Sequence, residues 1–249
     1  NLVYTGTDIE VVLTGNTYQA AFTESSPVST FNSGNQILLN ASGSLQIDNR
    51  ILTYMDNQWK AENEFSWSDL TGKTNVTAVY PVYPDLDYVQ ENLYKNNSLE
   101  DILYVKDEFP AGNSIHLQFK HLFSLLTLHL EGNLQTYFQK IEVTCPAVSS
   151  IIPKSAEIVL ADNGTHTTTI AQVSPSGNYS FIVPPVGNMV IAINMVTNGK
   201  KYTTQLETKS FTGNKEYTYH LKISEKTPGI MTAEDWIAFS QLINSNTFT

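Results

Sequence analysis

The chain has 249 residues, a formal net charge of −10 and a charged share of only 15%. Globular domains typically carry about 25% charged residues; here Thr, Ser, Asn and Gln replace the missing charge, as on the surface of β-rich exported proteins. Arg50 is the only arginine, which argues against nucleic-acid binding and against a clamp for nucleotide phosphates. The single cysteine, Cys145, excludes an internal disulfide and is expected to be a small buried apolar residue.

Short runs of alternating apolar and polar residues, rich in β-branched and aromatic side chains, follow one another along the chain. Most are separated by Gly- and Asn-containing turn signals, of which Asn163–Gly164 is one. Asn198–Gly199 lies between two such runs and predicts a hairpin. Strands at this spacing, without helical periods between them, indicate β-sandwiches. The predicted strands are 8–13, 36–40, 51–55, 76–80, 115–119, 122–130, 140–144, 156–160, 167–171, 179–183, 189–196, 202–206 and 216–223.

The middle of the chain, residues 83–106, is the least regular stretch and is expected to hold a short helix. The boundary between two domains is predicted near Lys120, where Phe119 would end one sandwich and a long strand from Leu122 would open the next. The sequence therefore predicts an all-β fold with two β-sandwich domains in tandem, the first over residues 1–120 and the second over residues 121–225.

The C-terminal segment, residues 226–249, has a different pattern. Thr232 is a suitable N-cap, and an apolar stripe at helical spacing follows it, formed by Trp236, Phe239 and Ile243. We therefore predict a linker and a short amphipathic α-helix over residues 233–244. This helix either packs on its own sandwich or begins a further module.

No motif in the sequence carries a recognised chemistry. Glycine-rich phosphate loops, a nucleophile elbow, HExxH and CxxC are all missing. The five histidines are spread along the chain and are interpreted as sheet or loop residues. Asp85 and Asp87 are the one carboxylate pair to consider for glycoside hydrolysis or calcium binding, and they are interpreted as a solvated loop. We therefore predict no enzyme activity, no catalytic residue, no cofactor and no metal site.

Large aromatic side chains gather in the first half of the chain, and aromatic residues in strands usually belong to the core. Exposed Trp and Tyr residues, however, often anchor binding surfaces. The alternative function is therefore a carbohydrate-binding module in which Trp59, Trp67 and Tyr83 form an exposed, coplanar platform.

Several motifs, taken together in this order and spacing, resemble the fimbrillin-like surface proteins of Bacteroides-type bacteria. The longest combines a Phe-x-His step with a long alternating strand over residues 115–132. The others open or close predicted strands. In chain order the motifs are FNSGNQI (31–37), LTYMDNQW (52–59), FSWSD (65–69), VTAVYPVYP (76–84), IHLQFKHLFSLLTLHLEG (115–132), YSFIVPP (179–185) and FTGNKEYTYHLKI (211–223).

This resemblance implies two transthyretin-like β-sandwiches in an exported lipoprotein of the cell surface, outer membrane or extracellular space. It further implies a pilus subunit or adhesin that pairs with other fimbrial subunits through donor strands, with a host or bacterial surface protein or a glycan as further partners. Contact with the membrane would be made only by an N-terminal lipid anchor that this chain does not contain.

Two features depart from the pattern of pilus stalk subunits in this family. The family's stalk subunits are cut after an Arg or Lys near the N-terminus, whereas Arg50 lies inside the first predicted domain. The chain also ends in a predicted helix rather than in a strand that could be donated. Both departures favour a tip or accessory subunit, or an adhesin.

Overall fold

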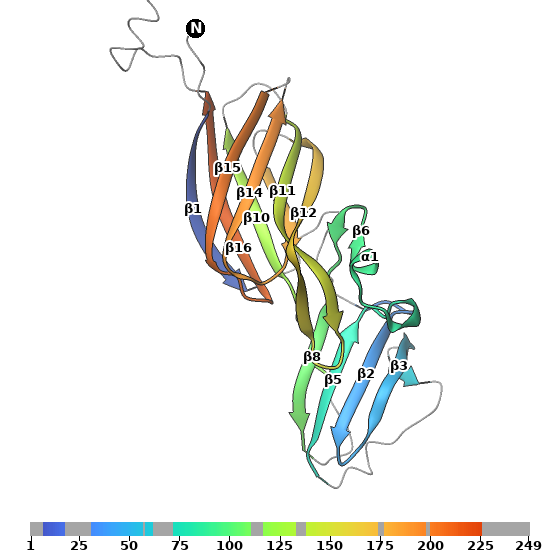
Figure 1. The fold of residues 1–249 in the computed structure, drawn as a ribbon. Helices are drawn as coiled ribbons and strands as arrows, with labels where there is room; N and C mark the ends of the chain where they lie inside the picture. Colours follow the sequence, from blue (N-terminus) through green and yellow to red (C-terminus); the bar gives the residue numbers. More distant parts are fainter. Residues whose placement is uncertain are drawn as a thin grey trace, which may run out of the picture.

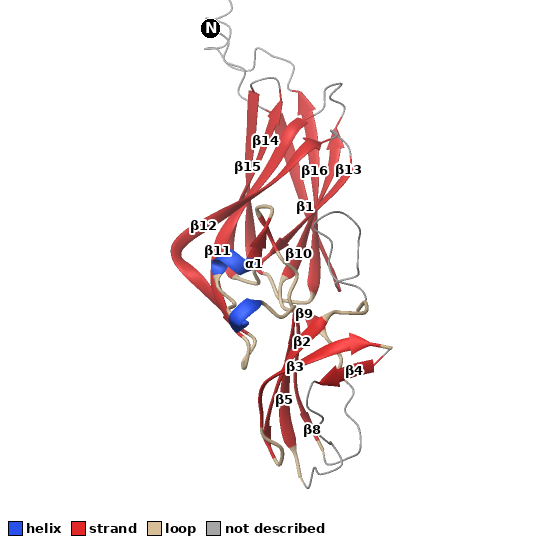
Figure 2. Cartoon of the chain, turned by 90° about the vertical axis from the view of Figure 1, so that its right-hand side faces the viewer, coloured by secondary structure: helices blue, strands red, loops and turns tan. Residues whose placement is uncertain are grey.

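The computed structural model describes residues 7–17, 31–56, 58–61, 72–110, 117–132, 138–173, 177–197 and 200–225. Within these ranges the secondary structure is almost entirely strand, as Figure 2 shows, with a 3-10 turn η2 (Pro84–Leu86) and a single helical turn α1 (Gln90–Leu93). The all-β prediction is confirmed. The predicted C-terminal helix, residues 233–244, lies outside the described residues.

The strands of the described ranges form two sheets of four strands, one sheet of six strands and a small two-stranded pair (Figure 1). Their bounds are β1 (Thr7–Thr17), β2 (Gln36–Gly43), β3 (Ile47–Met55), β4 (Gln58–Ala61), β5 (Thr74–Tyr80), β6 (Tyr94–Lys95), β7 (Ser98–Leu99), β8 (Leu103–Phe109), β9 (Lys120–His121), β10 (Ser124–Gly132), β11 (Phe138–Ile152), β12 (Glu157–Val173), β13 (Gly177–Val183), β14 (Gly187–Thr197), β15 (Lys200–Ser210) and β16 (Lys215–Glu225).

The two four-stranded sheets, ordered β1-β16-β10-β13 and β12-β11-β14-β15, enclose one hydrophobic core. Strict alternation builds it: on β10, Leu126, Leu128 and Leu130 are completely or almost completely buried, and the residues between them point away. We call this cluster the sandwich core; its members include Leu126, Leu128, Leu130, Ile141, Val143, Phe181, Ile191, Ile193, Met195, Tyr219 and Leu221.

The six-stranded sheet, ordered β4-β3-β2-β5-β8-β9, buries residues on both faces. On β2, Ile37 and Leu39 point to one face and Leu38 points to the other, so this strand reads as a continuous apolar run. We call the first cluster the aromatic core; it contains Ile37, Leu39, Val76, Ala78 and Val105, with Phe31, Trp59, Tyr80 and Phe119 packed against it.

A second cluster, which we call the junction core, joins the six-stranded sheet to the sandwich. Its members include Leu38, Val79, Tyr83, Tyr88, Leu93, Ile102, Leu122, Phe123, Leu125, Val148, Ile151 and Ile182. Val148 and Ile151 come from β11, whose far end leaves the sandwich and reaches the six-stranded sheet beside β8 (Figure 1). The hairpin of β11 and β12 therefore contributes residues to the sandwich core and to the junction core.

A bulge bends this hairpin, and its sequence signal was misinterpreted. Asn163–Gly164 was predicted to end a strand in a turn, but β12 runs through it as one strand. The register shifts on β11 between Pro146 and Ser150, Asn163 has φ 53°, and the strands pair again beyond it. A Cβ on Gly164 would lie 2.7 Å from the Ala161 Cβ. Asn163 and Gly164 can adopt the backbone conformations of a tight turn, but here they form a β-bulge that bends the hairpin (Figure 2).

The passage from the six-stranded sheet into β10 is tied to a segment nearly a hundred residues later. The Asn214 side-chain oxygen accepts a hydrogen bond from the His121 backbone N–H at 3.1 Å, and the Asn214 N–H donates to the Phe123 carbonyl at 3.0 Å. A Cβ on Gly213 would meet the Leu122 carbonyl oxygen at 2.5 Å, so only glycine permits this approach. Two motifs noted in the sequence, 115–132 and 211–223, thus hold each other in place.

The buried Asp101 adds a second tie at the same place. Its carboxylate lies 2.8 Å from His121 Nδ1, and the Leu122 N–H donates to the Ile102 carbonyl at 2.7 Å. Of the predicted strands, 115–119 is wrong over its described part, since residues 117–119 form no strand there, while residues 115 and 116 lie outside the described residues.

Candidate functional site

The outer strand of the first sheet is the feature most relevant to assembly. β1 pairs antiparallel with β16 over all of its eleven residues, from Thr7 opposite Glu225 to Thr17 opposite Lys215. It stands at the end of the sheet order, and among the described strands it pairs with β16 alone. The first strand of the chain is therefore joined to the last described strand, and not to the six-stranded sheet formed by residues 36–121.

The strand beside it, β16, contributes to the sandwich core. Tyr219 and Leu221 are almost fully buried there. In the register, Leu13 occupies the position opposite Tyr219, and Val11 the position opposite Leu221. Directly opposed residues of an antiparallel pair share a face of the sheet. Without β1, β16 would carry a row of unpaired backbone groups along one side, which is a template for another strand.

The aromatic residues predicted to contact a ligand do not form one platform. Tyr83 is only 5% exposed and lies in the junction core, with its hydroxyl donating to the Glu100 carboxylate. Burial, and the Glu100 carboxylate that accepts this bond, raise the Tyr83 pKa well above its ordinary value. Trp59 is half-buried against the aromatic core, with its ring 5.1 Å from and edge-on to Phe31. Trp67 lies outside the described residues.

Tyr83 and Trp59 therefore belong to clusters on opposite faces of the six-stranded sheet, so these two rings cannot be coplanar parts of one sugar platform. Sequence reasoning could not separate them, because a Tyr in a proline-rich loop gives no periodicity from which its burial can be read. The participation of Trp59 and Trp67 in ligand contact stays a prediction.

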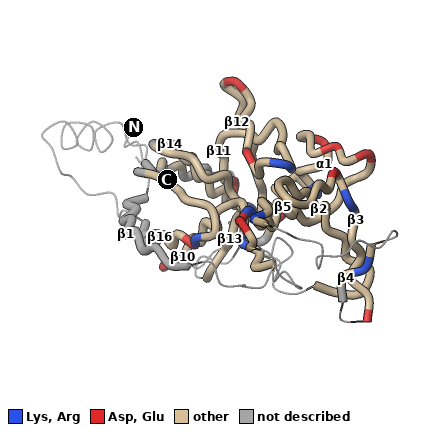
Figure 3. The backbone as a smooth tube through the Cα atoms, turned by 90° about the horizontal axis from the view of Figure 1, so that it is seen from below, with Lys and Arg blue, Asp and Glu red and all other residues tan. Residues whose placement is uncertain are grey.

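The acidic loop before α1 is solvated as expected. Asp85 and Asp87 are exposed, and the acidic residues of this region stand out around α1 in Figure 3. Within the described ranges, the only group of three or more His, Cys, Asp or Glu residues that could hold a metal ion lies elsewhere.

A pocket of about 740 Å³ opens on the six-stranded sheet, below the end of the β11–β12 hairpin. Its lining is polar and mixed in charge: Lys154 at the hairpin turn is paired with Asp48 on β3, and Lys106 on β8 donates to the Ser155 carbonyl. These contacts brace the hairpin end against the sheet. Charges of both signs in one lining do not select a class of ligand.

The potential metal-binding group was missed from the sequence. It consists of His129 and Glu131 on β10 and His220 on β16, on the outer, polar face of the first sheet. The parallel pairing of β10 with β16 sets His129 directly opposite His220. The two histidines are 91 positions apart in the sequence, so only the strand pairing reveals that they are neighbours. The local signal was the His-x-Glu spacing on a strand, which puts both side chains on one face.

A family comparison settles the relationship, since the model of the family described as fimbrillin-like matches residues 18–236. The chain belongs to the fimbrillin-like family. The resemblance seen in the sequence motifs is thereby confirmed. A comparison with curated proteins finds no match.

Solved structures share the fold of this fimbrillin-like chain. A candidate cell adhesion protein from Bacteroides ovatus has a TM-score of 0.56 at 14% identity, covering 79% of this chain and 84% of its own. Another from Bacteroides uniformis has a TM-score of 0.55 at 12% identity, covering 78% of this chain and 88% of its own. Among the described residues, no helix has the length and apolar character needed to span a membrane.

Proposed function

We propose that this fimbrillin-like protein is a cell-surface adhesin or a tip or accessory subunit of a pilus, and that it assembles with other fimbrial subunits by β-strand addition. The observation that carries the proposal is the position of β1, an edge strand that, of the described strands, pairs only with β16, over eleven residues. Strand addition needs such an edge, where backbone hydrogen bonds supply affinity and alternate side chains supply register.

Further support comes from what the edge strand adjoins. β16 contributes Tyr219 and Leu221 to the sandwich core. A strand that pairs with β16 therefore lies beside apolar core residues, in addition to forming backbone hydrogen bonds. An incoming strand with apolar residues at the register positions of Val11 and Leu13 would match the face on which the core lies. The same register selects its partners, because a slip of one residue would send polar residues to that face.

The wider parts of the proposal follow the family. We propose export to the cell surface, with attachment to the outer membrane through an N-terminal lipid, and cell adhesion as the biological role, as the names of the Bacteroides structures suggest for those proteins. We also propose two domains that divide near residue 120 and are followed by residues 226–249. The bounds predicted for the first domain, residues 1–120, need one correction, because β1 pairs with β16 and so belongs to the second domain. The absence of an enzyme activity belongs to this proposal as well, and it is supported by membership of a family described as fimbrillin-like.

A disulfide lock on β1 tests strand addition. Thr14 and Thr218 are directly opposed in the β1–β16 register, so the double variant Thr14→Cys, Thr218→Cys can tie the edge strand down. The control is Thr127→Cys, Ser180→Cys, which crosses the β10–β13 pair at the opposite edge of the same sheet and leaves β1 unlocked. The probe is a fluorescent peptide with the sequence of residues 7–17, TDIEVVLTGNT, which competes with the chain's own β1.

The wild-type protein and the oxidised control are expected to take up the labelled peptide slowly, because β1 must leave first, and a terminal-strand peptide from a co-purifying fimbrial subunit is expected to compete with it. The oxidised lock is expected to take up none until a reductant is added. Peptide uptake by the oxidised lock equal to that of the wild type, or no uptake by the wild type, would contradict the proposal.

A further inference from the structure

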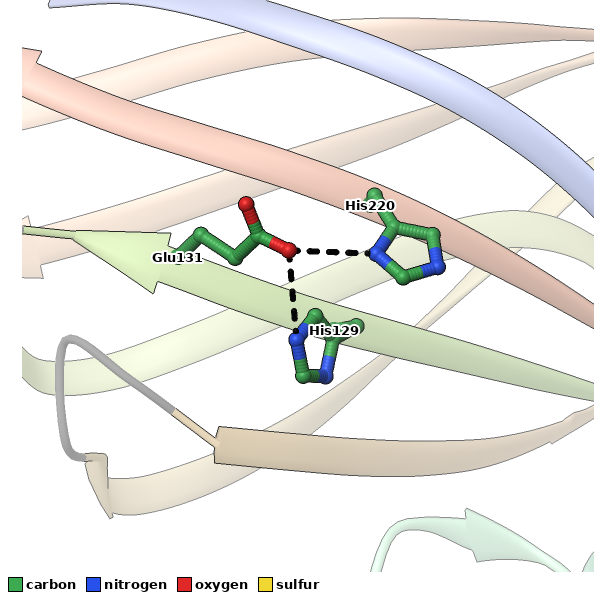
Figure 4. A group of neighbouring side chains, drawn as sticks. All are labelled: His129, Glu131 and His220. Carbon is green, nitrogen blue, oxygen red and sulfur yellow. Dashed lines mark hydrogen bonds and ion pairs between the residues drawn. The ribbon is translucent and has the colours of Figure 1, made fainter.

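The outer face of the first sheet carries a group of side chains that assembly by strand pairing does not use. On β10 and β16 the buried Leu130 and Leu221 alternate with outward residues, so His129, Glu131 and His220 project together from the side opposite the sandwich core. Figure 4 shows both imidazole rings directed at one carboxylate oxygen of Glu131. The ring centroids of the two histidines are 4.8 Å apart.

The distances within this group suit a shared cation. Glu131 Oε1 lies 3.4 Å from His129 Nε2 and 3.4 Å from His220 Nδ1. Two ligand atoms, each about 2.1 Å from a tetrahedral ion, are separated by about 3.4 Å. All three ligand atoms lie within 4.8 Å of one another, so a small movement of the half-exposed side chains would bring the two nitrogens to the same separation.

A neighbouring amide orients the first histidine. The Asn178 side-chain oxygen lies 2.5 Å from His129 Nδ1, and an amide oxygen only accepts, so that nitrogen carries a proton. In a neutral ring this leaves Nε2 with a lone pair that faces the Glu131 carboxylate. Two acceptors in this position repel unless a proton or a cation lies between them. An outer hydrogen-bond partner that fixes the ring of a ligating histidine is a common feature of metal sites.

We propose that His129, Glu131 and His220 bind a divalent transition-metal ion, with zinc as the best fit. Two imidazoles and one carboxylate form a donor set for zinc, and three protein ligands leave the fourth position to water or to a side chain of a partner. The ligands stand on two paired strands, which hold their backbones in fixed register. The ion would join β10 to β16, the strand that also carries the edge strand β1.

Titration of the full chain with ZnCl2, followed by calorimetry and by thermal unfolding, tests the site. One zinc per chain and a rise in melting temperature are expected, because an ion that binds only the folded state stabilises it. His220→Gln and Glu131→Gln are expected to abolish both effects. Asn178→Ala is expected to weaken zinc binding by about 10–100-fold, as for the loss of an outer hydrogen-bond partner. The control, His166→Gln, removes a strand histidine outside the group and is expected to bind zinc as the wild type does.

Further measurements distinguish a specific zinc site from non-specific metal binding. CaCl2 and MgCl2 are expected to produce no shift, because these ions prefer sets of oxygen ligands. The visible spectrum of bound Co2+ is expected to be that of a four-coordinate ion, and to be lost in His220→Gln. Absence of zinc binding by the wild type, equal binding by His220→Gln, or an equal response to calcium would overturn the proposal. The outcome is independent of strand addition, since every measurement uses the isolated chain.

Discussion

The two regions of the molecule bury their apolar residues in different ways. The two four-stranded sheets face each other and enclose the sandwich core with their own strands. The six-stranded sheet buries one face under the junction core, to which the end of the β11–β12 hairpin contributes Val148 and Ile151 from the other region. In the part of the chain that the structure describes, the two four-stranded sheets bury the sandwich core between themselves. The six-stranded sheet instead has one face partly covered by residues of the other region.

In this molecule, a change of sheet along the chain is not a change of hydrophobic core. The strands change sheet at β9 and β10, close to the predicted boundary at Lys120, yet the junction core draws on residues from both sides of that point. We therefore expect a substitution in the junction core to destabilise both regions. A substitution in the sandwich core should mainly destabilise the two four-stranded sheets.

The largest expected effect comes from truncating an aromatic residue in each cluster. Phe123→Ala in the junction core and Phe181→Ala in the sandwich core each remove a fully buried ring. Each is expected to lower the free energy of unfolding by about 3–5 kcal/mol, measured with a chemical denaturant. Hydrogen exchange separates them: Phe123→Ala is expected to speed exchange in both β5 and β13, and Phe181→Ala mainly in the sandwich sheets. If Phe123→Ala speeds exchange in only one of the two regions, the junction core does not stabilise both of them.

A smaller effect is expected at the tie between the two regions. Gly213→Ala would place a Cβ 2.5 Å from the Leu122 carbonyl oxygen, which the backbone must move to avoid. We expect a loss of about 1–3 kcal/mol in thermal or denaturant unfolding. Gly187→Ala is the matched control, because a Cβ there meets nothing within 4 Å, and it is expected to change stability by less than about 0.5 kcal/mol. Equal losses for the two variants would show that the close approach is unimportant.

The smallest effect at neutral pH concerns Cys145 in the sandwich core, whose thiol pKa burial raises to about 12. A free thiol has a pKa near 8.5, so at pH 7 the thiol is protonated in both the folded and unfolded states and stability hardly depends on it. As pH rises above about 8.5, the unfolded state loses the proton first and the folded state loses stability. Native protein at pH 8 is therefore expected to resist thiol reagents that react fully in denaturant. Rapid labelling of the native protein would show that the core opens readily.

The strands were predictable where alternation was regular, because a period of two is set by one buried face. The predicted strand 216–223, for example, lies inside β16, and 76–80 lies inside β5, which ends at Tyr80 before a proline as expected. β8 was missed, since its polar residues Lys106, Asp107 and Glu108 follow one another without a clear period. Asn163–Gly164 was misinterpreted because the same local conformations serve a turn and a bulge.

Among the functional features, too, those that depend on local sequence could be predicted and those that depend on distant segments could not. The family could be predicted from motifs in their order along the chain, because such motifs are local. The group of His129, Glu131 and His220 could not, since it depends on a parallel pairing between two strands that are far apart in the sequence. The burial of Tyr83 could not be predicted either, because it follows from the junction core, which distant segments assemble.

The pairing of β1 with β16 has a mechanical consequence. Thr7 lies opposite Glu225, so the described chain enters and leaves this sheet at the same end, away from the six-stranded sheet (Figure 1). The hydrogen bonds of an antiparallel pair are perpendicular to the strands, and tension applied between these two residues would open them in succession, like a zipper. Tension applied instead between the free end of the six-stranded sheet and Glu225 would load this ladder along the strands, because Thr17, the end of β1 from which the chain continues to β2, lies opposite Lys215 and not opposite Glu225. The hydrogen bonds would then resist the tension together, in shear. The direction of pull would thus decide whether the edge strand stays in place.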